Sequence, residues 1–362
     1  MTRQGQGVLI MAGGTGGHIF PGLAVAESLR QQGVAVSWLG ASGAMECQRV
    51  PAAGITLQTV DITGIRGKGL LSWLGLPFRL IKAVVQAFRV IGRVSPACAV
   101  SFGGYAAGPG GLAARIRGVP LLVHEQNRIP GMTNKVLARL ADTVLQAFPG
   151  TWPANLHARD CGNPVRSNVV DLPPPEQRMA ERSGPTRLLI TGGSQGARAL
   201  NRVLPDALAR IPAGRRPEVL HQAGKGWQVE TRAAYAEAGV ESEVTEFIDD
   251  MAAAYGWADL VVCRAGALTV SELAAAGLAS VLVPFPHAVD DHQTMNARFL
   301  VEAGAAELLP ETGCSPESLA NLFERLLWDR NRLMTMAAAA RSVAVPDAAE
   351  RVAKLCKEYL SA

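Results

Sequence analysis

The chain of 362 residues carries a formal net charge of +4; 48% of its residues are hydrophobic and 18% are charged. This length predicts two domains, and the apolar content excludes a disordered chain. Collagen-like and coiled-coil folds are excluded because no short repeat runs through the sequence.

The first half alternates short apolar runs with longer helical patterns. The predicted elements are strands at Val8–Met11, Val34–Leu39, Ile55–Val60, Ala97–Phe102, Pro120–Val123 and Thr143–Gln146, with a helix from about Pro21 to Gln32. Runs that are apolar throughout are typical of strands buried on both faces, as in a parallel sheet between helix layers.

The second half repeats this pattern. Its predicted elements are strands at Arg187–Thr191, Glu218–His221, Val244–Phe247, Leu260–Cys263 and Ser280–Val283, with a helix near Arg198–Ile211. We therefore expect an α/β protein with two Rossmann-like, doubly wound parallel-sheet domains that face a central cleft.

Proline density sets the expected domain boundaries. Five prolines fall within residues 164–185, where neither a helix nor a central strand is expected. We predict an N-terminal domain over 1–163, a linker over 164–185 and a C-terminal domain over 186–346. Residues 347–362 form an amphipathic helix that could pack on either domain.

The charge is divided unevenly between the two halves. Residues 1–163 hold 15 Lys and Arg against 6 Asp and Glu, whereas the remainder holds 20 against 25. A basic N-terminal half suggests an anionic partner, although chance and solubility give an alternative explanation.

The cysteines and the apolar runs indicate the cellular compartment in which the protein is expected. Six cysteines are scattered without metal-like spacing, which predicts reduced thiols in the cytoplasm. We expect no signal peptide, and no apolar run approaches the ~20 residues of a membrane-spanning helix. Attachment to a membrane surface remains open.

Each half has a glycine-rich turn between its first strand and the next helix, at residues 13–18 and 192–197. Glycine allows close backbone approach, and a helix N-terminus offers free N–H groups to an anion. A phosphate site and a tight turn without a ligand are both consistent with either loop. The first loop fails the dinucleotide fingerprint because Ile19 occupies the third glycine position, and no Walker A loop occurs.

Three more clusters follow predicted strands, at 102–105, 124–127 and 264–272. In open parallel sheets, ligands bind at the carboxyl ends of strands, so we expect these clusters to line one crevice. Glu272 is predicted in the first turn of a helix that ends near Gly277. It could hold a sugar diol, or it could simply stabilise the helix N-terminus.

Taken together, these motifs are specific. They are Met11-Ala12-Gly13-Gly14-Thr15-Gly16-Gly17-His18, His124-Glu125-Gln126-Asn127, Gly162-Asn163-Pro164-Val165-Arg166, Gly192-Gly193-Ser194-Gln195-Gly196-Ala197 and Cys263-Arg264-Ala265-Gly266-Ala267-Leu268-Thr269-Val270-Ser271-Glu272. Over nearly its whole length the chain resembles the bacterial lipid II synthases. These are the N-acetylglucosaminyltransferases of peptidoglycan assembly, and they are GT-B glycosyltransferases.

The resemblance implies a reaction. GlcNAc would pass from UDP-GlcNAc to the C4 hydroxyl of the muramoyl sugar of undecaprenyl-diphosphate-linked lipid I, with inversion, to give β1–4-linked lipid II and UDP. It also implies no metal ion and no cofactor. The sequence has no clear Asp-x-Asp site, and the pairs Asp249-Asp250 and Asp290-Asp291 are interpreted as loop and cap acids.

The resemblance also assigns donor-site residues. The transferred sugar would contact Thr15, Gly16, Gly17, Asn127 and Gln293, and the diphosphate or its surroundings would contact Arg166 and Ser194. Ile248 would hold the uracil through its backbone. The nucleotide would be enclosed by Ala267, Leu268, Thr269, Val270, Ser271 and Glu272, with Glu272 on the ribose. The role of His292 stays open, because some relatives carry glutamine there.

The acceptor hydroxyl must lose a proton as it attacks the anomeric carbon. Histidine suits this task because its unperturbed pKa, about 6.5, lies near working pH. His18 on the first glycine loop is therefore the leading candidate for the base, and Glu125 is the alternative. His18 could instead only hydrogen-bond the loop or a phosphate.

An apolar segment next to a basic helix predicts a membrane-docking surface. Its predicted residues are Leu70, Leu71, Trp73, Leu74, Leu76, Phe78, Arg79 and Lys82. Basic or polar residues continue at helical spacing with Gln86, Arg89 and Arg93, which suits an anionic bilayer. The alternative is an ordinary helix with a charged outer face. We expect peripheral binding to the cytoplasmic face of the plasma (inner) membrane.

Three rival functions remain. The first is a GT-B enzyme with another nucleotide sugar or a soluble acceptor. The second is a non-catalytic nucleotide- or nucleic-acid-binding protein, which is disfavoured because few aromatic residues are available for base stacking. The third is a Rossmann oxidoreductase. We expect no nucleic-acid partner.

Overall fold

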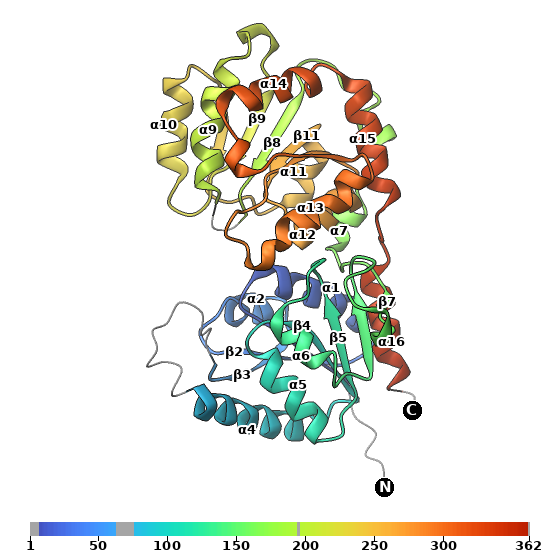
Figure 1. Ribbon diagram of the computed structural model, residues 1–362. Helices are drawn as coiled ribbons and strands as arrows, with labels where there is room; N and C mark the ends of the chain where they lie inside the picture. Colours follow the sequence, from blue (N-terminus) through green and yellow to red (C-terminus); the bar gives the residue numbers. More distant parts are fainter. Residues whose placement is uncertain (1–6, 63–75, 194–195, 361–362) are drawn as a thin grey trace. The chain divides into compact units, whose positions relative to one another are not determined.

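The structure, a computed structural model, describes residues 7–62, 76–193 and 196–360. The chain divides into two compact units (Figure 1). Unit 1 comprises Met1–Arg166 and Val345–Ala362, and unit 2 comprises Ser167–Ala344. Each unit contains one fully parallel sheet, which confirms the predicted fold class of two doubly wound, Rossmann-like domains.

The sheet of unit 1 has the strand order β3-β2-β1-β4-β5-β6-β7. Its strands are β1 (Val8–Ala12), β2 (Val36–Ala41), β3 (Thr56–Val60), β4 (Cys98–Gly103), β5 (Leu121–Glu125), β6 (Thr143–Gln146) and β7 (Arg159–Asp160). Six of them match predicted runs within about two residues at most ends. The strand β7 was not predicted, because two exposed residues leave no apolar pattern. The direction of strand succession reverses between β1 and β4, which is where such sheets bind ligands.

Helices cover both faces of this sheet. They are α1 (Gly16–Gln31), α2 (Glu46–Ala52), α4 (Leu76–Val94), α5 (Ala107–Ile116), α6 (Met132–Leu137) and α16 (Ala348–Glu358). Because side chains alternate along a strand, Leu9 and Met11 of β1 pack with α4, α5 and α6. Val8 and Ile10 pack on the opposite face with α1, α2 and α16.

The helix near the C-terminus returns to unit 1. Figure 1 shows α16 within this unit, and it packs along α1 with Val352 and Cys356 fully buried. The Lys357 ammonium donates to Gln32 Oε1 at 2.9 Å, and the Tyr359 hydroxyl lies 3.0 Å from Thr143 Oγ1. These contacts answer the question that the sequence left open about where this helix packs.

The sheet of unit 2 has the strand order β10-β9-β8-β11-β12-β13. Its strands are β8 (Arg187–Thr191), β9 (Glu218–Gln222), β10 (Glu243–Thr245), β11 (Leu260–Cys263), β12 (Ala279–Leu282) and β13 (Ala306–Leu308). The reversal of strand order here lies between β8 and β11. The short strand β13 was not predicted.

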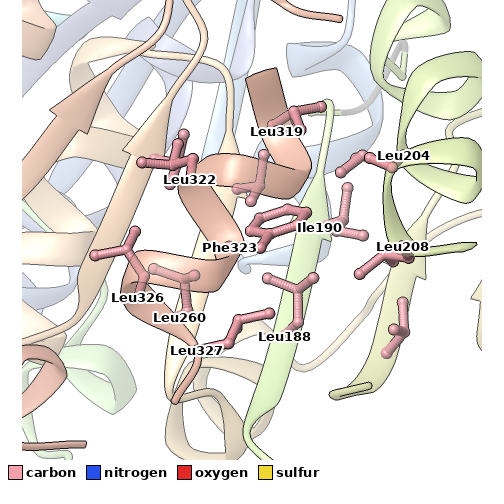
Figure 2. Packing of buried hydrophobic residues seen from close by; sticks show 14 of the residues in the cluster. Leu188, Ile190, Leu204, Leu208, Leu260, Leu319, Leu322, Phe323, Leu326 and Leu327 are labelled. Atoms are coloured by element: carbon pink, nitrogen blue, oxygen red, sulfur yellow. The ribbon is translucent and has the colours of Figure 1, made fainter. Parts of the chain in front are cut away.

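The helices of unit 2 are α7 (Ser167–Val170), α8 (Pro175–Met179), α9 (Arg198–Ala209), α10 (Gln228–Glu237), α11 (Met251–Trp257), α12 (Ala267–Ala276), α13 (His292–Glu302), α14 (Pro316–Leu326) and α15 (Arg330–Ser342). Figure 2 shows Phe323 of α14 packed against Leu188 and Ile190 of β8 in the buried core. Residues 164–185, expected as a linker, contain α7 and α8, and from Ser167 onward they belong to unit 2.

Candidate active site

In unit 1 the candidate residues follow three adjacent strands, β1, β4 and β5. Their backbones are in close contact. A Cβ added at Gly104 would lie only 2.2 Å from the carbonyl oxygen of Gly13, and the φ of Gly104 is +89°. Only glycine fits there, so the glycine cluster after β4 brings the ends of β1 and β4 together.

His18 lies in the first turn of α1, because the helix begins at Gly16 and not near Pro21 as predicted. Its backbone N–H donates to Thr15 O at 3.1 Å. Its ring is half-buried, and Nδ1 lies 3.0 Å from Gln126 Oε1, which follows β5. The fold thus joins the first glycine loop to the 124–127 motif, 108 residues further along the chain.

Glu125, the alternative base, is 1% exposed and its carboxylate accepts four hydrogen bonds. Oε1 accepts from the backbone and side-chain amides of Asn127 at 3.0 and 3.1 Å. Oε2 accepts from the Gly131 backbone at 3.1 Å and the Asn134 side chain at 3.0 Å. A carboxylate occupied in this way holds the turn together, so the geometry favours His18 over Glu125 as the base.

The other candidates of unit 1 vary in exposure. Thr15 and Gly17 are exposed, whereas Gly16 and Asn127 are half-buried. The guanidinium carbon of Arg166 lies 5.4 Å from the ring centre of Phe20 on α1, a cation–π contact. Arg166 is therefore held beside the helix whose first turn carries His18.

Glu46 of α2 supports the first glycine loop, a role that was not predicted from the sequence. It is fully buried, its Oε2 accepts from the Gly14 amide at 3.1 Å and its Oε1 accepts from the Ala41 amide at 2.8 Å. A Cβ at Gly13 would lie 2.2 Å from Oε1, so any side chain at position 13 would displace the carboxylate. A lone acid shortly after the second strand was the only signal available in the sequence.

In unit 2, α12 begins at Ala267, after a connection of three residues that follows Cys263 at the end of β11. Its first turn therefore presents backbone amides without partners inside the helix, which can bind an anion such as a phosphate. Glu272 lies in the second turn and not in the first as predicted. It is 4% exposed, and its Oε2 accepts from the Tyr255 hydroxyl at 3.1 Å, which fixes the carboxylate.

Gln293 lies in the first turn of α13, with its Oε1 accepting from the Phe285 backbone at 2.9 Å. That bond leaves the Nε2 group to act as a donor. Ile248 is half-buried in the loop between β10 and α11. Ser194 lies outside the described residues, and so do Leu70, Leu71, Trp73 and Leu74.

Asp250 and Asp291 each directly precede a helix, but of these two only Asp250 caps its helix through the side chain. Asp250 caps α11 by accepting from the Ala253 amide at 3.0 Å. Asp291 precedes α13 and accepts from the Thr294 hydroxyl at 2.6 Å. Among the described residues, no three His, Cys, Asp or Glu side chains are grouped as a metal ion would require.

The second glycine loop is supported by a buried polar group. A Cβ at Gly196, whose φ is +75°, would lie 2.1 Å from Ala223 O. The same oxygen accepts from Asn201 Nδ2 at 2.9 Å, and Asn201 Oδ1 lies 3.1 Å from Nε2 of buried His221. Burial lowers the pKa of His221 to about 3, so its ring is neutral near pH 7.

The outer face of α4 combines apolar and basic side chains. Phe78, Ile81 and Val85 are 78%, 62% and 42% exposed at helical spacing, and Ile116 of the adjoining α5 is 61% exposed. Arg79, Lys82, Arg89 and Arg93 are exposed on the same helix. Lys82 pairs with Asp61 at 2.9 Å, which reduces the net positive charge. The helix begins at Leu76, one residue before Pro77.

Within residues 7–62, 76–193 and 196–360, no helix is both long enough and apolar enough to span a bilayer.

Comparisons with known proteins agree with this arrangement. Residues 8–146 match the family model of the glycosyltransferase family 28 N-terminal domain, and residues 187–352 match that of the C-terminal domain. A Marinobacter nauticus protein named UDP-N-acetylglucosamine–N-acetylmuramyl-(pentapeptide) pyrophosphoryl-undecaprenol N-acetylglucosamine transferase is 54% identical, covering 97% of this chain and 96% of its own. A Chromohalobacter salexigens protein of the same name is 55% identical over 98% of both chains.

A solved structure is similar over nearly the whole length. The crystal structure of Acinetobacter baumannii MurG superposes with a TM-score of 0.84 and 42% sequence identity, covering 98% of this chain and 99% of that one. The UDP-GlcNAc 2-epimerase of Neisseria meningitidis, solved with UDP-GlcNAc bound, has a TM-score of 0.67 at 12% identity, which is similarity of fold alone.

Proposed function

The chain belongs to glycosyltransferase family 28, and we propose that it transfers GlcNAc from UDP-GlcNAc to the C4 hydroxyl of the muramoyl sugar of lipid I. The products are lipid II and UDP, and the anomeric centre inverts. The observation that carries this proposal is the 54% identity, over 97% of the chain, to a transferase named for that reaction. Within it, unit 1 serves the lipid acceptor and unit 2 binds UDP-GlcNAc.

His18 is the general base of this reaction. Its half-buried ring lies in the first turn of α1 and is held through Nδ1 by Gln126, so Nε2 is the nitrogen left to face a substrate. It removes the proton from the acceptor hydroxyl as the oxygen attacks the anomeric carbon. A positioned imidazole contributes about 10²–10⁴-fold to such a step.

The leaving UDP gains negative charge, and backbone amides stabilise it. The amides of Leu268 and Thr269 at the start of α12 meet the phosphates, where the positive end of the helix dipole adds to their effect. Arg166 supplies a positive charge to the diphosphate. Ser194 of the second glycine loop contributes a hydroxyl.

The remaining donor contacts give specificity for the nucleotide and the sugar. Glu272, oriented by Tyr255, accepts from the ribose hydroxyls. The backbone of Ile248 holds the uracil, and the Nε2 group of Gln293 donates to a GlcNAc hydroxyl. Thr15, Gly16, Gly17 and Asn127 contact the transferred sugar.

A mass-spectrometric turnover assay tests the activity. The protein is incubated with UDP-GlcNAc and a short-chain lipid I analogue, and UDP-glucose and UDP-GalNAc serve as controls. We expect one GlcNAc added per acceptor from UDP-GlcNAc and much slower transfer from the other donors. Transfer to a soluble acceptor but none to the lipid I analogue contradicts the proposal and favours another sugar transferase.

The acceptor is a membrane lipid, and we also propose that unit 1 binds an anionic membrane surface on the cytoplasmic side. The exposed Phe78 and Ile81 of α4 insert among headgroups, and the surrounding Arg79 and Arg89 attract acidic lipid. Each basic residue near such a surface contributes about 1 kcal/mol.

Vesicle sedimentation tests this surface. We expect the protein to sediment with phosphatidylglycerol-containing vesicles and much less with phosphatidylcholine alone, and the double change Phe78→Ser, Ile81→Ser to abolish the difference. Val229→Ser is the matched control, because Val229 is 82% exposed on α10 of unit 2. Equal binding of both vesicle types, or unchanged binding of the α4 variant, rejects membrane docking by this surface.

A further inference from the structure

A buried polar chain runs from the end of β5 to His18. His124 is fully buried, and its Nε2 lies 2.9 Å from the carbonyl oxygen of Gly162. A carbonyl oxygen can only accept, so this nitrogen carries the ring proton. Burial lowers the pKa of His124 to about 4, so near pH 7 the ring is neutral and its Nδ1 is an acceptor.

Gln126 is the second member of the chain and is 1% exposed. Its Nε2 lies 3.0 Å from His124 Nδ1 and 2.9 Å from the His124 carbonyl oxygen. Both of these atoms are acceptors, which assigns the amide nitrogen of Gln126 to this side. The flipped amide would place its oxygen against two acceptors, each about 3 Å away, and would be repelled by both.

The amide oxygen of Gln126 therefore faces His18. Oε1 lies 3.0 Å from His18 Nδ1 and can only accept, so Nδ1 must donate. In a neutral imidazole with its proton on Nδ1, the lone pair is on Nε2.

We propose that Gln126, itself oriented by His124, holds His18 in the tautomer with the proton on Nδ1 and so presents Nε2 as the proton acceptor. Gln126 and His124 are positioning residues in this account, because they act through His18. The inference deepens the proposed function, in which His18 is the base.

Packing limits the alternatives open to the His18 ring. A Cβ added at Gly103, whose φ is +97°, would lie 3.2 Å from both Cε1 and Nδ1 of His18. The end of β4 thus lies against the Nδ1–Cε1 edge of the ring. At the other end of this hydrogen-bonded series, the ring of Phe102 packs against the His124 ring with 5.2 Å between the ring centroids. The three hydrogen-bonded side chains of His124, Gln126 and His18 are therefore preorganised before any substrate binds.

The tautomer can be measured without substrate. Long-range ¹H–¹⁵N spectra of histidine-labelled protein at about pH 8.5, where unperturbed imidazoles are neutral, separate protonated from unprotonated ring nitrogens. We expect His18 to carry its proton on Nδ1 and His124 to carry it on Nε2, with His18→Gln identifying the His18 signals. A His18 ring protonated on Nε2, or averaged between both nitrogens, overturns the proposal.

A variant then connects the tautomer to turnover. Gln126→Met keeps the shape and removes the acceptor. We expect the proton of His18 to leave Nδ1 and kcat to fall by about 10²-fold, within the range of an acid–base contribution, while KM for UDP-GlcNAc changes by less than about threefold. Unchanged kcat, or an unchanged His18 spectrum, in this variant contradicts the proposal.

A control separates positioning from stability. Gln146 is also a buried glutamine, at the end of the neighbouring β6, with its amide bonded to Asp160 and Trp152. Gln146→Met should leave the His18 tautomer unchanged. If the wild-type protein forms no lipid II analogue, the proposed function fails while the tautomer measurement still stands. The wild-type spectrum needs no variant, so the proposal can be rejected even if Gln126→Met does not fold.

Discussion

The buried carboxylate of Glu46 accepts a hydrogen bond from the backbone amide of Gly14, with 3.1 Å between Oε2 and the nitrogen. The two residues are 32 positions apart, on α2 and on the glycine loop after β1. An amide that points inward to a carboxylate is fixed in direction. The conformation of the glycine loop that precedes His18 is therefore fixed by this hydrogen bond to a side chain of α2.

Replacing this carboxylate tests the support. In Glu46→Gln, one of the two backbone amides of Gly14 and Ala41 must face an NH₂ group instead of an acceptor. We expect the free energy of unfolding, measured with urea, to fall by about 1–3 kcal/mol, which is the cost of a buried donor without a partner. The matched control is Glu27→Gln on the exposed face of α1, which should change stability by less than about 0.5 kcal/mol. Equal stability of the two variants would refute the role of Glu46.

The contact between Gly104 and Gly13 predicts a steric effect. Gly104→Ala would force a Cβ to within 2.2 Å of Gly13 O, so we expect a loss of about 2 kcal/mol or more in unfolding free energy. Gly33 also has a positive φ, +75°, but apart from its chain neighbours no atom of the described residues lies within 4 Å of its Cβ position. Gly33→Ala should therefore lose only about 1 kcal/mol, from backbone strain. Denaturation curves that coincide for the two variants would show that the close approach to Gly13 O does not add to the destabilisation of Gly104→Ala.

Removing the base should separate binding from turnover. We expect His18→Ala to bind UDP-GlcNAc nearly normally by calorimetry and to lose about 10²–10⁴-fold in turnover. His157→Asn is the control, because His157 is exposed with a φ of +47°, a conformation that asparagine tolerates. Retention of nearly full activity in His18→Ala would remove this residue from the mechanism.

Two buried histidines predict acid sensitivity. Burial lowers the pKa of His124 to about 4 and that of His221 to about 3, whereas both rise to about 6.5 on unfolding. The unfolded chain thus binds more protons, so stability falls as the pH drops below about 6.5 and continues to fall until the folded pKa values are reached. At about pH 5 each histidine lowers the free energy of unfolding by about 2 kcal/mol relative to neutral pH.

This pH effect can be checked in two ways. Urea midpoints should be clearly lower at about pH 5 than at about pH 7.5, a window above the usual pKa range of carboxylates. The C2-proton resonances of His124 and His221 should stay constant across the same range. Titration of either resonance with a midpoint near 6.5 would contradict their burial as neutral rings.

Much of the fold could be predicted from the sequence. Runs such as Leu260–Cys263 are apolar at every position, a pattern that only strands covered on both faces need, and the structure has β11 over the same residues. The glycine loops and the 124–127 motif identified the family before any geometry was known. The strands that were not predicted are too short or too polar to show an apolar pattern, as with the two-residue β7.

The chemistry of the candidate base depended on tertiary structure. The sequence could place His18 after the first strand and Gln126 after a later one, but hydrogen bonding between them requires β1, β4 and β5 to be neighbours in the sheet. Strand order follows from how each crossover packs, and apolar periodicity does not encode it. The sequence therefore determined which residues stand at strand ends, and only the fold decided which of them meet, because hydrogen bonds extend about 3 Å while the partners lie more than a hundred residues apart.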